Sequence, residues 1–281
     1  MKKKAVKDVV LILAALVALF LAMEFLTPLF FPFPGFLKII LLVLSAVFML
    51  MVRMPLSYAP HPEALQALNN LTAVTVDRVF VHSWPGKYYV FTPGNEKAEK
   101  GLILYPGGFV DPRVYAPVVR AIAEQGYLAV IVGMPFDLAS FGFSRANAII
   151  RRYPHIKKWA IAGHSLGAWM ACRFAGINRA SVKGVVLWAS CPSEKYRLDD
   201  TGLKVLHVHG TKDGIVTQEK LKGLQANLPA DTVFVKVDGG NHTQFGCYAG
   251  GQQRFDNRAD IAAIDQQKII TKATVQFLSD L

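Results

Sequence analysis

The chain has few cysteines, few charged residues and no nucleotide-binding motif. Only three of its 281 residues are cysteine, at irregular spacing, which excludes a disulfide scaffold and argues against a structural zinc site. Neither G-x-x-x-x-G-K-[ST] nor G-x-G-x-x-G occurs, so the sequence has no motif for a nucleotide cofactor. Charged residues make up 18% of the chain against 52% for apolar ones, which excludes an intrinsically disordered protein.

Acidic residues are the scarcer of the two charge signs. The chain has 31 Lys and Arg against 20 Asp and Glu, a formal net charge of +11. The basic residues are spread along the chain and form no stripe with interleaved aromatics, so we expect no nucleic-acid partner. Their densest group is typical of a solvated face and would also suit anionic lipid headgroups; it comprises Arg151, Arg152, Lys157 and Lys158.

Charge is almost absent from a long stretch near the N-terminus. Residues 9–52 are predominantly apolar and carry only two charges, Glu24 and Lys38. The stretch is too long for one membrane span, which needs about 20 residues, and it contains a cluster of prolines in its middle. We therefore predict a transmembrane helical hairpin with spans near 9–30 and 36–53. In this interpretation residues 1–57 are a membrane anchor and 58–281 a catalytic domain.

A cleaved signal peptide is the alternative for this segment, although no small-x-small cleavage site is evident. If the segment is retained, the protein is expected in the cell membrane. Four lysines within the first seven residues favour a cytoplasmic N-terminus. Two crossings would return the domain to the cytoplasm, whereas a single crossing would place it outside.

From residue 58 onwards, short apolar runs alternate with stretches of helical periodicity. This alternation predicts an α/β fold with a doubly wound, mostly parallel sheet. Asp77 and Arg78 within the first run indicate an edge strand. We expect strands at 74–82, 88–91, 101–105, 128–132, 159–162, 183–189, 203–209 and 232–237, and helices at 114–124, 145–152, 166–175, 218–227 and 261–278.

The most informative motif is the G-x-S-x-G pentapeptide at residues 163–167, which follows a predicted strand and opens a predicted helix. A tight turn between the two elements would expose the hydroxyl of Ser165, as in a nucleophile elbow. The helix N-terminus would then stabilise negative charge developing beside it. The alternative is a serine that only caps the helix.

A serine hydroxyl is a weak nucleophile that needs a base, itself held by an acid. Asp213 and His242 each lie in a glycine-containing loop after a predicted strand, at the same edge of the sheet as Ser165. The order Ser, Asp, His is the one found with a nucleophile elbow. The alternatives are a turn aspartate and a surface histidine.

Two backbone N–H groups are needed to hold the oxyanion. We expect one from Leu166, directly after the nucleophile. The loop after the strand at 101–105 contains two consecutive glycines, which leave room for a carbonyl oxygen to approach. We expect the second N–H from Gly108 or Phe109.

These motifs together resemble the α/β-hydrolase superfamily, and in particular a bacterial branch of compact, membrane-anchored members. The resemblance covers about residues 60–281 and is carried by LILYPGGFVDPRVYAP, VIVGMPFDLA, IAGHSLGAWMA, HVHGTKDGIV and GGNHTQFGCY. The short chain is also similar in size to the dienelactone hydrolase group, which has a cysteine nucleophile where this chain has Ser165. The resemblance implies Ser165 as nucleophile, Asp213 as acid and His242 as base. A second glycine common after the elbow is replaced here by Ala168.

The expected function is that of a serine hydrolase that cleaves carboxylic esters through an acyl-enzyme, without a metal or organic cofactor. Only about a dozen residues separate the strands at 183–189 and 203–209, too few for a helical cap, so an open site is expected. Such a site suits small esters or acyl lipids. An acyltransferase or peptidase with the same triad is one alternative. A catalytically silent, membrane-tethered interaction module is another. The sequence does not identify protein partners.

Overall fold

The structure is a computed structural model, and it describes residues 36, 39–40, 43–44, 58–80, 87–94 and 98–281. The chain divides into two units, Met1–Leu56 and Ser57–Leu281. The predicted spans at 9–30 and 36–53 lie almost entirely outside the described residues and stay a prediction. Among the residues that are described, no helix is both long and apolar enough to cross a bilayer.

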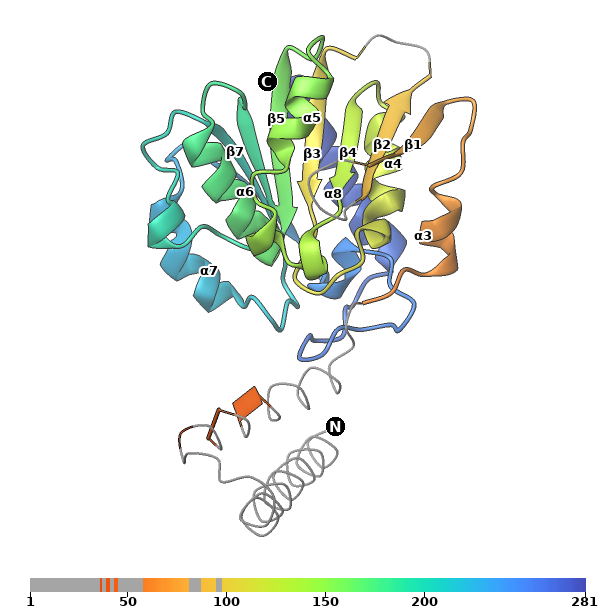
Figure 1. Ribbon diagram of the computed structural model, residues 1–281. Helices are drawn as coiled ribbons and strands as arrows, with labels where there is room; N and C mark the ends of the chain where they lie inside the picture. The colour runs from red at the N-terminus through yellow and green to blue at the C-terminus, as the bar shows by residue number, and fades with distance from the viewer. Residues whose placement is uncertain (1–35, 37–38, 41–42, 45–57, 81–86, 95–97) are drawn as a thin grey trace. The chain divides into compact units, whose positions relative to one another are not determined.

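The second unit is built on a sheet of eight strands with helices on both faces (Figure 1). The strand order is β1-β2-β4-β3-β5-β6-β7-β8. β2 pairs antiparallel with β1 and with β4, whereas all other neighbours are parallel. The predicted doubly wound, mostly parallel α/β fold is therefore confirmed. The strands are β1 Val74–Phe80, β2 Lys87–Pro93, β3 Lys100–Tyr105, β4 Leu128–Val132, β5 Lys158–His164, β6 Gly184–Trp188, β7 Lys204–Gly210 and β8 Val233–Val237.

The middle strands are buried on both faces because helices cover both. Every residue of β4 and β6 is buried, as expected for near-continuous apolar runs in a parallel sheet. Side chains alternate between the two cores along each strand: in β3, Leu102 and Leu104 join one core and Ile103 the other. β1 lies at one edge, as its Asp77 and Arg78 predicted.

One core contains residues of α4 and α8, and the other contains residues of α5, α6 and α7. The helix predicted at 114–124 begins with a 3₁₀ turn, and α4 follows it. The Asp111 side chain caps this turn by accepting the N–H of Arg113. The helices are α3 Pro62–Gln66, α4 Ala116–Ala123, α5 Ala146–Arg152, α6 Leu166–Ile177, α7 Gln218–Leu224 and α8 Ala263–Ser279. The 3₁₀ turns are η1 Pro112–Tyr115, η2 Pro135–Asp137, η3 Ala139–Phe141, η4 Glu194–Tyr196, η5 Gln225–Asn227 and η6 Thr243–Phe245.

Candidate active site

Ser165 occupies a sharp turn between the end of β5 and the start of α6. Its backbone has φ +52° and ψ −119°, a left-handed conformation that is uncommon for any residue but glycine. The Ser165 N–H donates to the Trp188 carbonyl at the end of β6, 3.0 Å away, which fixes the turn to the neighbouring strand. The hydroxyl itself has no hydrogen bond within the described part of the chain. It is therefore available to a substrate at the end of the sheet.

The two glycines of the motif are required by close backbone contacts. A Cβ at Gly163 would lie 2.3 Å from the carbonyl carbon of Gly167. A Cβ at Gly167 would lie 2.2 Å from the carbonyl oxygen of Tyr105, in the loop that leaves β3. The motif thus lets α6 start directly against both β5 and this loop.

Asp213 and His242 are brought together although they are 29 positions apart in the sequence. His242 Nδ1 lies 2.8 Å from Asp213 Oδ2, and both side chains are almost completely buried. The other carboxylate oxygen, Oδ1, accepts from the N–H groups of Ile215 (2.9 Å) and Val216 (2.7 Å). Because both oxygens are held, the carboxylate has a fixed orientation towards the imidazole.

The loop that carries His242 is held by a residue that the sequence analysis missed. Gln266 in α8 is fully buried and binds the backbone of Asn241 twice: its Oε1 accepts from the N–H at 3.0 Å, and its Nε2 donates to the carbonyl at 2.8 Å. The Gly240 carbonyl in the same loop accepts the N–H of Lys212 at 2.8 Å. No local sequence signal marks Gln266, because a helix glutamine is ordinarily exposed.

His164, the residue before Ser165, lies beside His242. The centroids of the two imidazole rings are 4.5 Å apart, so the elbow and the Asp213–His242 pair are direct neighbours. Burial, and next the nearby His242, lower the pKa of His164 well below its usual value and keep the ring neutral. The Tyr115 hydroxyl lies 2.8 Å from His164 Nδ1 and accepts the N–H of Gly107 at 3.0 Å. Tyr115 thus links the His164 ring, which lies beside His242, to the loop after β3.

The structure separates the two candidates for the second oxyanion donor. The Phe109 N–H donates to the Asp137 carbonyl at 2.8 Å and is therefore engaged. The Gly108 N–H has no bonding partner among the described residues, and a Cβ at Gly108 would lie 3.1 Å from Cδ2 of Leu166. Of the predicted donors, Leu166 and Gly108 remain.

The described connection between β6 and β7 adds no helical cap to this edge of the sheet. The segment that joins these two strands, all of it described, contains only the short turn η4. Ser165, Leu166, Gly108 and Phe109 are each partly exposed. The connection is thus as short as the sequence indicated, and the open site stays a prediction.

The sequence also matches a known protein family. The model of the "Alpha/beta hydrolase family" matches residues 101–268, more than half of the chain. The chain belongs to the alpha/beta hydrolase family. This membership indicates a hydrolase. No curated protein matches the hydrolase significantly.

Solved structures share its fold at low sequence identity. A predicted CIB-like hydrolase from Thermoplasma acidophilum is 17% identical with a TM-score of 0.54, over 74% of this chain and 100% of that one. A serine hydrolase without a lid from Xanthomonas campestris is 15% identical with a TM-score of 0.53, over 74% and 97%. Esterase 2 of Thermogutta terrifontis, phosphoramylated by tabun, is 14% identical with a TM-score of 0.52, over 75% and 96%.

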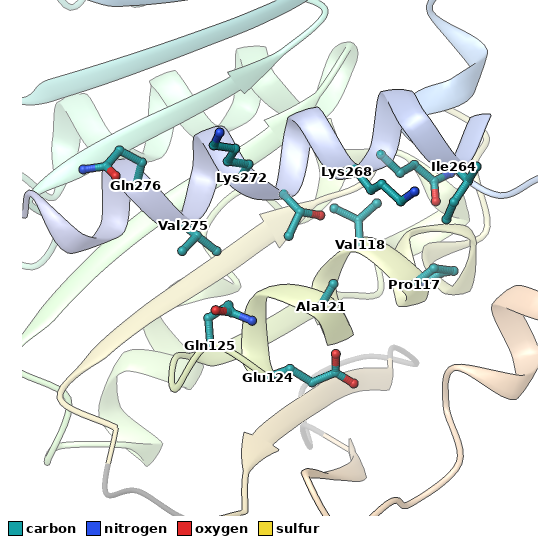
Figure 2. A pocket seen from close by; sticks show the side chains of 12 residues that line it. Pro117, Val118, Ala121, Glu124, Gln125, Ile264, Lys268, Lys272, Val275 and Gln276 are labelled. Carbon is teal, nitrogen blue, oxygen red and sulfur yellow. The ribbon is translucent and has the colours of Figure 1, made fainter. Parts of the chain in front are cut away.

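Two large pockets lie in the described part of the hydrolase, and neither is lined by Ser165. One, of about 520 Å³, is beside the His242 loop and is lined by Asn241, Thr243 and Cys247 among others. The other, of about 430 Å³, lies between α4 and α8 (Figure 2). Its lining includes Lys268 and Lys272 but neither Ser165 nor His242, so it is separate from the candidate site.

Metal-binding side chains gather in one place within the described chain. His61, Glu63 and Cys247 offer ligand atoms that all lie within 4.8 Å of one another. Ser165, Asp213 and His242 are not part of this group. The group borders the pocket beside the His242 loop.

Proposed function

We propose that this hydrolase cleaves carboxylic esters with Ser165 as nucleophile, His242 as base and Asp213 as the acid that orients the base. The observation that carries the proposal is the buried Asp213–His242 pair, with Nδ1 and Oδ2 at 2.8 Å, beside the strained turn of Ser165. A buried carboxylate with every oxygen held has an orienting role to play, as in a serine-hydrolase triad.

The proposed proton transfers run through Nε2, the second ring nitrogen of His242. A carboxylate only accepts, so His242 Nδ1 carries the proton towards Asp213 and Nε2 is left as the acceptor. His242 takes the Ser165 proton as the serine oxygen attacks the carbonyl carbon, and passes it to the departing alcohol. Water, deprotonated by the same nitrogen, then attacks the acyl carbon; the bond to the serine oxygen breaks, and His242 returns the proton to that oxygen.

The N–H groups of Leu166 and Gly108 are the proposed donors to the oxyanion. They come from the start of α6 and from the loop after β3, two segments that the glycine contacts hold together. The N-terminus of α6 adds a favourable dipole for negative charge. Each donor of this kind is worth about 10²–10³-fold in rate.

The short β6–β7 connection and the structural neighbours support the proposed substrate class. With no long segment between β6 and β7 over the site, small esters and acyl chains both have access. The Thermogutta terrifontis neighbour is an esterase that reacts with tabun, an organophosphorus compound. Esters are therefore proposed ahead of amides or of acyl transfer to another acceptor.

Hydrolysis of 4-methylumbelliferyl esters of increasing acyl length tests this function. Wild type should release the fluorophore, and Ser165→Ala should lower kcat/KM by at least about 10⁴-fold with an unchanged melting temperature. Ser144→Ala, an exposed serine in the loop before α5, is the matched control and should retain full activity. Turnover by Ser165→Ala at the wild-type rate would refute the assignment.

A further inference from the structure

Two loops at the edge of the sheet that carries Ser165 share a Phe-Asp pair: Phe136-Asp137 after β4, and Phe255-Asp256 after the His242 loop. Phe255 (72% exposed) and Phe136 (71%) are the most exposed large apolar side chains in the described chain. Single exposed apolar residues are ordinary. Two such side chains at the rim of one site, each in a Phe-Asp dipeptide, indicate a shared role.

Both phenylalanines have a left-handed backbone, with φ +54° at Phe136 and +72° at Phe255. This conformation is strained for a bulky aromatic residue and persists only where surrounding contacts impose it. The fold therefore holds each ring outward at a cost, instead of turning it into the core.

The aspartates that follow supply these contacts, and they connect each loop to the site. Asp256 is buried, and its Oδ1 accepts the N–H of Gly214, next to Asp213, at 3.0 Å. Its Oδ2 accepts the N–H and hydroxyl of Thr243, next to His242, at 2.7 and 2.6 Å. On the other side, the Asp137 carbonyl accepts the N–H of Phe109 in the oxyanion loop.

Further apolar and basic groups complete the rim. The ring of Phe141, 66% exposed, lies 5.9 Å from the ring of Phe136, edge to face. The Arg254 guanidinium lies 4.8 Å over the ring of Phe255, and Arg258 is exposed in the same loop. Neither arginine has a carboxylate partner within the described residues. Exposed aromatics beside unpaired arginines match the apolar and anionic layers of a membrane surface.

We propose that Phe136, Phe141 and Phe255 dock this rim onto an anionic lipid bilayer, so that the site takes acyl esters directly from the membrane. The proposal rests on the ester hydrolysis proposed above and specifies its substrate as a bilayer-resident acyl ester. The predominantly apolar sequence of residues 9–52 and the net charge of +11 favour the same partner.

Fluorescence quenching tests the docking in the full chain. Phe136→Trp, Phe255→Trp and the control Ile177→Trp are reconstituted into phosphatidylcholine–phosphatidylglycerol vesicles with or without brominated acyl chains. Ile177 is 68% exposed but ends α6, which runs away from the Ser165 edge. We expect bromine to quench the added emission at 136 and 255 but not at 177. Equal emission with and without bromine at both rim positions would overturn the proposal and leave the rim to a protein partner.

A pair of substrates separates this inference from the proposed function. In the same vesicles, Phe136→Asn/Phe255→Asn should lower hydrolysis of 4-methylumbelliferyl oleate about tenfold, through lost apolar burial, and that of the water-soluble acetate by less than about twofold. Asparagine is chosen because it tolerates a positive φ. Equal losses on both esters would contradict docking. If wild type cleaves neither ester, the function fails, while the quenching result still decides the docking.

Discussion

At the scale of single residues, the proposed base His242 is supported by a second layer of side chains. His164 lies against His242, and the Tyr115 hydroxyl joins His164 Nδ1 to the N–H of Gly107. One hydroxyl group therefore joins the ring that lies against the proposed base to the loop of the proposed oxyanion donor Gly108. We expect this group to position the reacting residues.

Tyr115→Phe should lower kcat by about 10- to 100-fold, because small misplacements of reacting groups cost that much. Tyr105→Phe is the matched control: its hydroxyl is equally buried and bonds the Phe143 carbonyl and the Ala146 N–H, away from His164. Both variants should lose about 1–3 kcal/mol of stability, since each leaves a buried N–H without its partner. Steady-state kinetics and urea unfolding compare them, and an equal fall in kcat would mean that Tyr115 serves stability alone.

At the scale of elements, the turn between β5 and α6 depends on glycine at two positions. Gly163 and Gly167 leave no room for a Cβ, whereas a Cβ at Gly176, in the last turn of α6, would meet nothing within 4 Å. The same substitution should therefore have opposite effects at the two ends of one helix.

Gly167→Ala should destabilise the fold by about 1–3 kcal/mol or more and abolish activity, because the methyl group collides with the Tyr105 carbonyl. Gly176→Ala should instead stabilise it by about 0.5–1 kcal/mol, since alanine loses less entropy in a helix. Melting temperature and ester turnover measure both. An active, undestabilised Gly167→Ala would show that the turn is looser than described.

Sequence patterns predicted the strands and helices well where the hydrophobic pattern was local. The eight strands follow from apolar runs, and the placement of Ser165, Asp213 and His242 at strand ends follows from parallel connectivity. The bond from the Phe109 N–H to Asp137 was not predictable, because it joins loops after different strands. The supporting roles of Gln266 and Tyr115 were not predictable for the same reason, because their hydrogen-bond partners are distant in sequence.

At the scale of the whole molecule, buried neutral histidines make stability depend on pH. His207 in β7 is buried, and burial, with a smaller contribution from His209, lowers its pKa from 6.5 to about 3. The unfolded chain therefore binds a proton at this residue between about pH 6.5 and 3, whereas the folded chain does not. Stability is thus fully present above the unfolded pKa and falls as pH decreases through this window.

The free energy of unfolding should fall below pH 6.5 with a slope approaching about 1.4 kcal/mol per pH unit for each such histidine. His207→Leu should make the slope shallower, whereas His155→Gln, at an exposed position, should leave it unchanged. Urea unfolding of the full chain in detergent, followed by tryptophan fluorescence from pH 4 to 8, gives these slopes. A slope identical in wild type and His207→Leu would show that His207 does not stay neutral in the fold.

The whole molecule is also proposed to be a membrane protein, with residues 1–57 as its anchor. In that arrangement the domain faces the cytoplasm if both predicted spans cross, as the lysines at the N-terminus favour. Protease accessibility in intact cells distinguishes the two sides.

Covalent labelling with a fluorophosphonate probe tests the central claim, an activated Ser165, most directly. The probe reacts with a serine only where a base has made it nucleophilic. We predict labelling of wild type and none of Ser165→Ala or His242→Ala, with all three proteins folded. Folded wild type that takes up no label, or a Ser165→Ala variant labelled as strongly as wild type, would contradict the account.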